Sequence, residues 1–302
     1  MSEPKLIAVD WGTSSFRLWV LDEAGTVLAE SRGHDGMLFA AREGFQNVLL
    51  RHLKASKAPA ELPILICGMA GARGGWVEAG YVETPAALTD IAAKATPVTG
   101  LKRDIRILPG LCQRSADQPD VMRGEETQLL GAAAALSGDA LVCMPGTHSK
   151  WVSIESGRVV HFATYMTGDL FEAISHHTIL AAPDKTVADG PESRAFIAAA
   201  RQAVANPGRL TSQLFGARSG QILNGLSASA SLAHISGSLI GAEIGGAISA
   251  GAPGTIRLVA SGRMRALYEA ALTAAGLAFE TIDADEAVRN GLRVAAGQIW
   301  PH

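Results

Sequence analysis

The sequence contains few cysteines, and their arrangement excludes two kinds of stabilised small domain. Cys67, Cys112 and Cys143 are odd in number, widely spaced and without a Cys-x-x-Cys pair. A disulfide framework usually shows an even set of cysteines, and a structural zinc site needs closely paired ligands. The cysteines therefore favour a reducing compartment, and we expect a cytoplasmic protein.

A strong charge of one sign and a long apolar run are also missing. The 302 residues carry a net charge of -3, which provides no basic field for nucleic acid or for an anionic membrane. A membrane-spanning helix needs roughly 20 apolar residues, and Glu243 interrupts the best candidate. The chain runs from Met1 to Lys5 and then directly into an apolar strand, so we expect no signal peptide. These absences predict a protein that binds neither nucleic acid nor membrane.

Two common nucleotide-binding motifs do not occur. No Gly-x-x-x-x-Gly-Lys-Ser/Thr sequence is present, and no two glycines are separated by a single residue. The P-loop and the dinucleotide-binding Gly-x-Gly-x-x-Gly are therefore both excluded. A nucleotide would have to be held by turns of another kind.

What is present is a pattern that occurs twice. An apolar strand (Leu6–Asp10) leads into the turn Gly12-Thr13-Ser14-Ser15, and the strand Leu141–Met144 leads into Gly146-Thr147-His148-Ser149. Each turn precedes a return strand, a second turn that contains an acidic residue and Gly, and a third strand. The predicted strands that follow the turns are Phe16–Leu21, Thr26–Ser31, Trp151–Ile154 and Arg158–Ala163. The spacing is 146 − 12 = 134 residues, about half the chain, which indicates a duplicated unit.

Helical patterns alternate with further strands behind each copy, which indicates the α/β class. The expected helices are 43–54, 125–136, 168–180, 192–205, 226–250, 264–275 and 285–300, and the further strands are 63–67, 105–108 and 255–260. The glycines of the helix 226–250 are expected to allow close packing.

Three glycine turns are candidates for binding a nucleotide. Turns rich in small residues expose backbone N–H groups that can surround phosphate, as expected at Gly12 and Gly146. Asp10, at the end of the first strand, could hold Mg²⁺ directly or through water. Gly262 lies between a strand and a helix, where a bare backbone suits adenine or ribose. Each turn alone is also compatible with a purely structural role.

Longer motifs resemble those of one family. Asp10-Trp11-Gly12-Thr13-Ser14, the stretch Pro145 to Lys150 and Ser261-Gly262-Arg263 resemble the two phosphate motifs and the adenosine motif of the actin, Hsp70 and sugar-kinase superfamily. More narrowly, the stretches 68–79, 122–128 and 165–171 resemble the 2-dehydro-3-deoxygalactonokinase family, essentially over the whole chain.

The resemblance implies a two-lobed actin-like ATPase fold of ribonuclease H-like units, with a mixed sheet and flanking helices in each lobe and a cleft between them. The N-terminal lobe is expected over residues 1–124, with the first phosphate turn and the sugar-acid loops. The C-terminal lobe is expected over 125–284, with the second phosphate and adenosine turns. The final helix, 285–302, is expected to pack back on the N-terminal lobe.

The activity implied by the resemblance is transfer of the ATP γ-phosphate to the terminal hydroxyl of 2-dehydro-3-deoxygalactonate, with Mg²⁺. Such a reaction needs in-line positioning, charge neutralisation and a base. Sugar kinases of this fold place a carboxylate where a helix begins, which makes Glu125 the expected base and Asp169 its competitor. Either could instead complement a helix dipole or cap a helix, and Glu126 is expected at the surface or as a cap.

The remaining site residues follow from the charges of the two substrates. A sugar acid carries a carboxylate, which suits Arg73, with Arg123 as the alternative. Trp76 could pack on the carbons of the ligand or fill the core, and Met37 is a further expected contact. The predicted cofactor-binding set for ATP is Asp10, Gly12, Thr13, Ser14, Gly146, Thr147, His148, Ser149, Lys150 and Gly262. Lys150 could equally be a surface lysine, His148 could be structural, and His176 with His177 make a poor metal pair on a helix.

Two other readings remain open from the sequence. One is another sugar kinase of the same fold, acting on 2-keto-3-deoxygluconate or an N-acetylhexosamine. The other is a non-enzymatic actin-like ATP-binding protein. A homodimer is the expected partner state, besides the small-molecule substrates.

Overall fold

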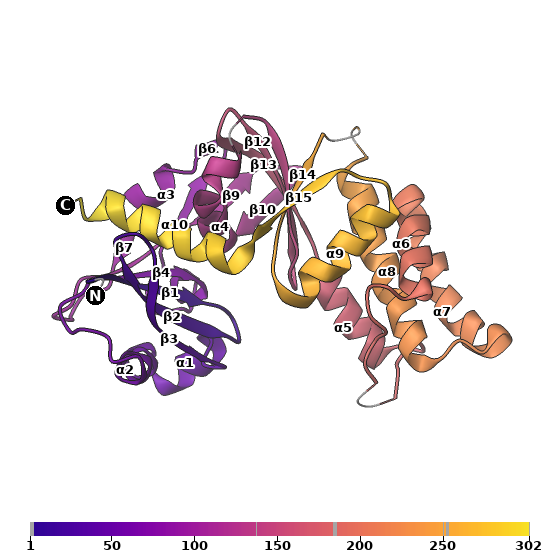
Figure 1. Cartoon of the computed structure of the whole chain (residues 1–302), viewed down its shortest axis with the longest axis horizontal. Helices are drawn as coiled ribbons and strands as arrows, with labels where there is room; N and C mark the ends of the chain where they lie inside the picture. Colours follow the sequence, from indigo (N-terminus) through magenta and orange to yellow (C-terminus); the bar gives the residue numbers. More distant parts are fainter. Residues whose placement is uncertain (1–2, 137, 184–185, 250, 252–253, 302) are drawn as a thin grey trace. The chain divides into compact units, whose positions relative to one another are not determined.

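A computed structural model describes residues 3–136, 138–183, 186–249, 251 and 254–301. The chain forms two compact units, whose helices and strands are labelled in Figure 1. Unit 1 comprises Met1–Asp139, Ile154–His161 and Asp283–His302, and unit 2 comprises Ala140–Ser153 and Phe162–Ile282. The sequence-based division begins the second lobe at residue 125, whereas the structure keeps the helix that begins there in unit 1, because this helix packs against the C-terminal helix.

The main sheet of unit 1 has the order β3-β2-β1-β4-β8-β7. Strands β1 to β3 form an antiparallel meander, and β4 and β8 continue the sheet in parallel with β1. The bounds are β1 (Pro4–Trp11), β2 (Phe16–Asp22), β3 (Val27–Gly33), β4 (Ile64–Gly68), β7 (Thr96–Pro97) and β8 (Ile105–Ile107). The apolar runs of β1 and β4 are buried, as expected for strands that are covered on both faces.

The rest of unit 1 consists of short strands and helices. A second sheet has the order β10-β9-β5, and β6 pairs with the first residues of β13. The strands are β5 (Tyr81–Glu83), β6 (Ala86–Ala87), β9 (Gly110–Arg114) and β10 (Pro119–Met122). The helices are α1 (Met37–Glu43), α2 (Phe45–Ala55), α3 (Asp90–Ala93), α4 (Glu125–Gly131) and α10 (Ala284–Ile299), with 3-10 turns η1 (Met69–Gly71) and η2 (Ala133–Leu136). Helix α10 packs against α4, β1 and β4.

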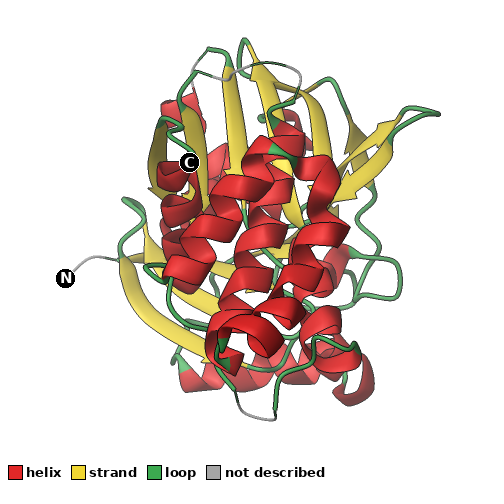
Figure 2. Cartoon of the chain, turned by 90° about the vertical axis from the view of Figure 1, so that its right-hand side faces the viewer, coloured by secondary structure: helices red, strands yellow, loops and turns green. Residues whose placement is uncertain are grey.

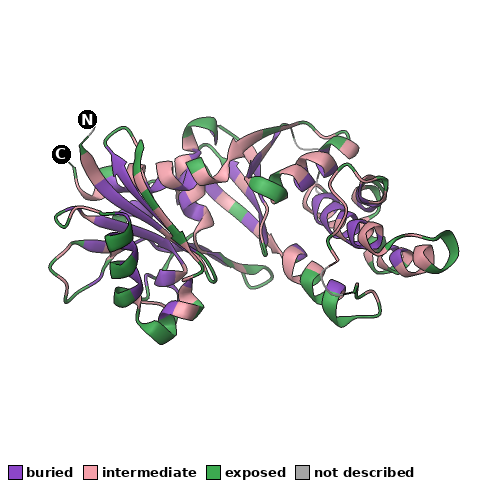
Figure 3. Ribbon diagram, turned by 60° about the horizontal axis from the view of Figure 1, so that its bottom comes forward, coloured by how far each residue is buried: buried purple, intermediate pink, exposed green. Residues whose placement is uncertain are grey.

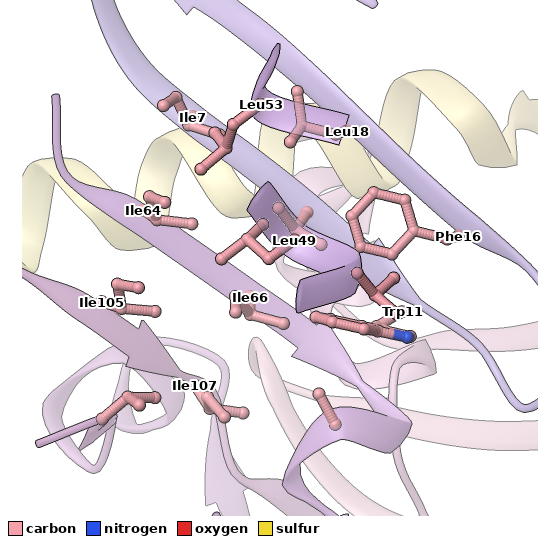
Figure 4. Close-up of a cluster of buried hydrophobic side chains, with 14 of the residues drawn as sticks. Ile7, Trp11, Phe16, Leu18, Leu49, Leu53, Ile64, Ile66, Ile105 and Ile107 are labelled. Carbon is pink, nitrogen blue, oxygen red and sulfur yellow. The ribbon is translucent and has the colours of Figure 1, made fainter. Parts of the chain in front are cut away.

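The core of unit 1 lies between the meander sheet and helix α2. Figure 4 shows Leu49 and Leu53 of α2 among side chains of the β-strands, such as Ile7, Ile64 and Ile66. An aromatic group closes one end of this core: the ring centroids of Trp11 and Phe16 are 4.7 Å apart. Burial of this apolar surface is the main force that holds the sheet and the helix together.

Unit 2 repeats the topology of unit 1. Its sheet has the order β15-β14-β11-β12-β13, with β14 parallel to β11. Residues 154–161, at the end of β12 and the start of β13, are counted with unit 1. Counted from the first strand of each copy, both units therefore have the order 3-2-1-4-5, and the predicted duplication of a mixed sheet is confirmed. The strands are β11 (Ala140–Met144), β12 (Ser149–Glu155), β13 (Arg158–Tyr165), β14 (Ile256–Ala260) and β15 (Phe279–Asp283). The α/β, ribonuclease H-like fold class is likewise confirmed.

Helices cover the sheet of unit 2, as Figure 2 shows. They are α5 (Thr167–His177), α6 (Arg194–Ala205), α7 (Leu210–Asn224), α8 (Ala228–Ala247) and α9 (Gly262–Ala274), with η3 (Pro207–Arg209). Helix α8 carries a stripe of three glycines, Gly237, Gly241 and Gly245, and a Cβ on each would lie 2.4 Å from a backbone oxygen of α6. The expectation that these glycines allow close helix packing is confirmed. Much of α8 is buried, as Figure 3 shows, yet no helix among the described residues is sufficiently long and apolar to cross a membrane.

Candidate functional site

The first turn (Gly12–Ser15) joins β1 to β2 in unit 1. The N–H of Gly12 donates a hydrogen bond to the carbonyl oxygen of Ser15 over 2.9 Å, which closes the turn. Thr13 and Ser14 are exposed between these two residues. The turn therefore presents two hydroxyl-bearing residues and their backbone to solvent, as a phosphate-binding turn would.

The beginning of α1 supports this turn. The N–H of Met37 donates to the carbonyl oxygen of Gly12 over 2.9 Å. Gly36, just before the helix, lies so close that a Cβ there would be 2.4 Å from the carbonyl oxygen of Thr13. A side chain at residue 36 would thus displace the turn. The half-buried Met37 is part of this support through its backbone.

Asp10 is the last residue but one of β1, beside the first turn, and its carboxylate is held by the guanidinium of Arg17. Oδ2 of Asp10 accepts hydrogen bonds from Nε of Arg17 over 3.1 Å and from Nη2 over 2.6 Å. Arg17 also pairs with Asp285 at the start of α10. The Sγ of Cys67 lies 3.8 Å from the other oxygen, Oδ1. Asp10 is thus fixed in position, with Oδ1 the less occupied of its two oxygens.

The carboxyl ends of β1 and β4 meet the start of α4 in unit 1. A Cβ on Gly68 would lie 2.6 Å from the carbonyl oxygen of Trp11 and 3.5 Å from Oδ1 of Asp10, and Gly68 has a φ of 88°. A Cβ on Gly124 would in turn lie 3.6 Å from Cα of Gly68. Glycine at these two positions therefore allows β1, β4 and the N-terminus of α4 to converge, which brings Asp10 and Glu125 to the same end of the sheet.

Two adjacent carboxyl groups begin α4. Oε2 of Glu125 accepts from the N–H of Arg123 over 3.1 Å, and Glu125 is partly exposed. Glu126 is fully buried, and its oxygens accept from the N–H of Gly124 over 2.7 Å and from the hydroxyl of Thr127 over 2.9 Å. Burial, and next the charge of Glu125, raise the pKa of Glu126 to about 8. Of the two expectations for Glu126, the surface position is wrong, because the helix turns this side chain inward. The capping role is confirmed, because Glu126 accepts from the N–H of Gly124, the residue that caps α4.

The buried thiol of Cys67 in β4 is influenced by both acidic groups. Burial raises the pKa of this thiol well above its usual value, and the charges of Asp10 and Glu126 raise it further. Charges act more strongly on a buried group, because the dielectric constant around it is low. Asp10, whose Oδ1 lies 3.8 Å from the thiol, and Glu126 therefore both belong to the surroundings of Cys67 in unit 1.

The loop predicted to bind a sugar acid follows β4. Arg73 is exposed and makes no hydrogen bond or ion pair with any residue that the structure describes. Trp76 is partly buried, with its ring stacked on Phe45 at a centroid distance of 6.2 Å and near Trp11 at 6.1 Å. Arg73 is therefore available to a ligand, whereas one face of Trp76 belongs to the aromatic group of the core.

Arg123 has a different environment from Arg73. Its guanidinium lies 4.5 Å from the ring centroid of Tyr81, and Nη2 donates to the carbonyl oxygen of Gly80 over 2.7 Å. Its Nε and Nη1 are buried without a hydrogen-bond partner in the described part of the chain. A Cβ on Gly71 would lie 2.9 Å from Nη1. Arg123 thus packs against the residues that flank the Arg73 loop.

The second turn (Gly146–Ser149) joins β11 to β12 in unit 2, and the start of α5 supports it. The N–H groups of Gly168 and Asp169 donate to the carbonyl oxygen of Thr147 over 3.1 and 3.3 Å. A Cβ on Gly168 would lie 2.6 Å from Cα of Thr147. The second turn is therefore supported by a glycine at a helix start, as the first turn is by Gly36. This part of the duplication was not apparent from the sequence.

The side chains of the second turn lie in two directions. His148 is half-exposed, and its Nε2 lies 2.5 Å from Oδ2 of Asp169. Ser149 is fully buried, with its hydroxyl 2.9 Å from that of Tyr268. Lys150 is also buried, and its Nζ donates to the carbonyl oxygen of His148 over 3.0 Å. The interpretation of Lys150 as a surface lysine is wrong, because its side chain folds back beneath the turn.

A buried carboxylate that the sequence analysis did not assign to the site lies beneath the second turn. Glu243 of α8 is 3% exposed and accepts hydrogen bonds from Trp151 Nε1 over 2.8 Å and from the Tyr268 hydroxyl over 2.7 Å. The hydroxyl of Thr167 is its third donor. The available signal was a lone acidic residue in an otherwise uncharged, small-residue helix, a pattern that often marks a buried polar group with a defined partner.

The third glycine turn lies at the start of α9. Gly262 has a φ of 58°, and a Cβ there would meet no atom within 4 Å among the described residues. Glycine at this position thus serves the backbone conformation, and the surface above it is open. The helix dipole adds a partial positive charge at this end.

The described residues hold no cluster of three or more His, Cys, Asp or Glu that could bind a metal by itself. Mg²⁺ usually binds through one or two carboxylates together with substrate phosphates and water. A single carboxylate beside an open turn, as at Asp10, fits that kind of site. His176 contacts Glu172 of its own helix rather than a metal group.

Comparisons with known proteins identify the family of the chain. Residues 10–295 match the family model described as 2-keto-3-deoxy-galactonokinase. The chain is 56% identical over 299 residues to a protein of Rhizobium meliloti (strain 1021) that is named a probable 2-dehydro-3-deoxygalactonokinase, and 97% of each chain is covered. It is 33% identical over 296 residues to the 2-dehydro-3-deoxygalactonokinase of Escherichia coli (strain K12), again with 97% of each covered.

A solved structure extends the likeness to three dimensions. The crystal structure of a protein from Sinorhizobium meliloti that is assigned to the 2-dehydro-3-deoxygalactonokinases has a TM-score of 0.94 and 55% identity, and covers 98% of this chain and 100% of that one. Family, relatives and structure agree over nearly the full length, so the readings as a hexosamine kinase or a non-enzymatic protein are not favoured. The chain belongs to the 2-keto-3-deoxy-galactonokinase family, whose members are phosphotransferases that act on an alcohol group.

Proposed function

We propose that the chain transfers the γ-phosphoryl group of ATP to the C6 hydroxyl of 2-dehydro-3-deoxy-D-galactonate, in the degradation of galactonate. The product would be 2-dehydro-3-deoxy-6-phosphogalactonate. The observation that carries this proposal is the convergence of Asp10, Gly68 and the start of α4 at one end of the unit 1 sheet. A phosphate turn, a carboxylate for a cation and a candidate base lie together there, as phosphoryl transfer requires.

The base in this proposal is Glu125. Its carboxylate is oriented by the N–H of Arg123, and it is partly exposed, so it can reach a substrate hydroxyl. It would accept the proton of the C6 hydroxyl as the oxygen attacks phosphorus. The buried Glu126 is neutral at pH 7, because its pKa is about 8, and so adds little negative charge beside the base. Asp169 is the less favoured base, since one of its oxygens is bound to His148.

Backbone N–H groups and hydroxyls would bind the phosphates of ATP. In unit 1 these belong to Gly12, Thr13 and Ser14, and in unit 2 to Gly146 and Thr147, with Gly262 at the nucleoside. Mg²⁺, when bound at Asp10, supplies neutralisation of phosphate charge. Ser149 and Lys150 are assigned a supporting role, because both side chains are buried beneath the second turn.

The carboxylate of the sugar acid would pair with Arg73. This guanidinium is exposed and has no ion-pair partner among the described residues, and its fork geometry matches a carboxylate. Trp76 and Met37 would contact the carbons of the substrate. Arg123 would hold the loop, because it already contacts Gly80 and Tyr81.

Substrate specificity is the direct test of the proposal. An assay coupled to ADP formation is carried out with the galactonate and gluconate epimers of the 2-keto-3-deoxy acid and with N-acetylhexosamines. We expect the highest kcat/KM for the galactonate epimer, loss of turnover when Mg²⁺ is chelated, and a phosphomonoester at C6 in the ³¹P and ¹H NMR spectra of the product. A higher kcat/KM for another acceptor would contradict the proposed substrate.

The cellular setting belongs to the same proposal. We assign the protein to the cytoplasm, which agrees with three buried, unpaired cysteines. We also propose a homodimer, for which light scattering of the purified protein is the test. A mass of 31.4 kDa would identify a monomer instead.

A further inference from the structure

A continuous hydrogen-bonded chain connects the second turn to the interior of unit 2. The N–H of Gly146 lies 3.5 Å from the hydroxyl of Ser149, and that hydroxyl lies 2.9 Å from the hydroxyl of Tyr268. Tyr268 donates to Glu243 over 2.7 Å. Because Tyr268 has a single hydroxyl hydrogen, Ser149 must donate to Tyr268. Every donor in the chain thus points toward the carboxylate of Glu243.

A second connection reaches the same carboxylate from the other side of the turn. Thr167, the first residue of α5, donates its hydroxyl to Glu243. The next residue, Gly168, donates its N–H to the carbonyl oxygen of Thr147. Glu243 therefore holds both the turn and the helix start that supports it, while Trp151 binds its other oxygen.

The burial of this carboxylate needs an explanation, because it is costly. Removal of a carboxylate from water is unfavourable unless several hydrogen bonds replace the lost hydration. Glu243 is the only Asp, Glu, Lys or Arg in α8, and its neighbours in the helix are small or apolar. An apolar residue would fill a helix core without that cost. The three donors come from β12, α5 and α9, so this one group fixes three elements around the second turn.

We propose that Glu243, acting through Tyr268 and Thr167, is a positioning residue that holds the second turn in the conformation that binds nucleotide. The inference rests on the proposed role of Gly146 and Thr147 in phosphate binding. Backbone N–H groups bind phosphate only when they are aimed at it, and a supporting shell of buried hydrogen bonds fixes that aim. Glu243 itself touches no substrate, and its effect passes through the turn.

The test compares variants that keep the packing volume. Glu243→Gln replaces one accepting carboxylate oxygen by an amide N–H₂ group. This donor then faces the donors that bind Glu243 in the wild type. Tyr268→Phe removes one hydroxyl from the chain and keeps the buried ring. Ile244→Val is the matched control, because it alters a fully buried neighbour in α8 that is outside the hydrogen-bonded chain. Binding of ADP is measured by calorimetry, the two KM values by the coupled assay, and the midpoint of thermal unfolding by calorimetry.

We expect the Kd of ADP and the KM of ATP to rise by about 10-fold to 100-fold in Glu243→Gln, because the N–H groups of the second turn are displaced from the phosphate. The rise should be smaller in Tyr268→Phe. The KM of the sugar acid should change less than that of ATP. Ile244→Val should lower only the unfolding midpoint. If both network variants lower the midpoint and leave the Kd of ADP unchanged, the role is merely structural and the inference is overturned. If Glu243→Gln does not fold, Tyr268→Phe decides alone.

Binding of ADP needs no sugar acid, which separates this inference from the proposed function. A wild-type protein that binds ADP but phosphorylates no sugar acid would contradict the proposed function, while the variants still test Glu243. A wild-type protein that phosphorylates the sugar acid, with variants that bind ADP equally well, would contradict only the inference.

Discussion

The first and second turns have the same backbone design and different support beneath it. Each is a strand-to-strand turn against which a glycine at a helix start packs, Gly36 in unit 1 and Gly168 in unit 2. Beneath the first turn lies an aromatic group that includes Trp11 and Phe16. Beneath the second lies the polar chain that ends at Glu243. The duplicated topology thus fixes the shape of a turn, and each unit stabilises it by a different kind of interior.

The two units also differ in their buried carboxyl groups. Glu243 accepts from three side-chain donors, whereas Glu126 accepts from one backbone N–H and one hydroxyl beside the like charge of Glu125. Burial raises the pKa of both groups, to about 8 for Glu126, and the hydrogen bonds to Glu243 act against that rise. The two groups therefore differ in their hydrogen-bond donors rather than in the direction of the pKa shift. The larger number of donors favours a supporting role for Glu243, and the like charge beside Glu126 agrees with the proposed base at Glu125.

The assignment of the base to unit 1 leads to the largest expected effect. In Glu125→Gln the hydroxyl of the sugar acid loses its proton acceptor, and kcat should fall by about 10²-fold to 10⁴-fold. Binding of ADP should persist. The matched variant Asp169→Asn in unit 2 should reduce kcat far less. Single-turnover kinetics check both variants, and the reverse ranking would move the base to unit 2.

The contrast between the buried carboxyl groups predicts a pH dependence of stability. Glu126 has an ordinary pKa of 4.5 and a folded-state pKa of about 8, so the folded state binds its proton more tightly. Its contribution is fully present below about pH 4.5 and is lost as the pH rises through about 8. The total change is on the order of a few kcal/mol.

Urea unfolding of wild type and Glu126→Gln checks this dependence. The free energy of unfolding of wild type, relative to that of the variant, should decrease as the pH rises through the same range. A difference that stays constant with pH would mean that Glu126 is ionised in the folded protein. Urea unfolding of Glu243→Asp, measured over the same pH range, shows whether a carboxyl group with three donors gives a different pH dependence from that of Glu126.

The assignment of substrate contacts to unit 1 is tested with Arg73. In Arg73→Ala a charge-assisted pair worth about 1.5–3 kcal/mol is lost, so the KM of the sugar acid should rise roughly 10-fold to 100-fold. The KM of ATP should be nearly unchanged. Arg42→Ala, which removes another exposed arginine of unit 1, is the control. Equal increases in both KM values would show that Arg73 does not read the substrate carboxylate.

Equivalent glycine substitutions at the two turns are expected to have the smallest effect. They test directly whether the two turns act in the same way. Gly36→Ala and Gly168→Ala each force a methyl group against the backbone of a turn, which costs about 1–3 kcal/mol by overpacking. Both should raise the KM of ATP. Gly297→Ala in unit 1 and Gly208→Ala in unit 2 are controls, since a Cβ there has no described atom within 4 Å. An increase for only one variant would mean that the turns are not equivalent in binding.

Much of the fold was predictable from the sequence, because its strands are apolar runs bounded by turns. The predicted strands at 6–10, 63–67 and 141–144 correspond to β1, β4 and β11, and most boundaries agree within two residues. The strands β5, β6, β7, β9, β10 and β15 were not predicted, and neither were the short helices α1 and α3. These strands contain two to five residues, and all except β9 hold at most one buried residue, so no apolar run marks them. Helix α7 was also not predicted, because its apolar residues do not gather on one face.

The parts of the site that consist of backbone turns were predictable from the sequence. The parts that depend on which side chains are buried were not. Glycine turns and their order are visible in the sequence, so the positions of Gly12, Gly146 and Gly262 could be inferred. The inward orientation of Glu126 and Lys150 depends on which helix face or strand face meets the core. Glu243 was interpreted only as an interruption of an apolar run, since its donors are 25 to 92 residues distant in sequence.

The attachment of α10 to unit 1 affects how the protein can mature during synthesis. Gly131 and Gly291 let α4 and α10 pack backbone to backbone, and α10 also covers β1 and β4. Residues 283–302 must therefore leave the ribosome before α10 can cover the first strands. Until then the nascent chain exposes an unfinished apolar face, and chaperones would have reason to bind it. We therefore expect truncation before residue 284 to expose β1 and β4 and to destabilise the N-terminal half of the chain.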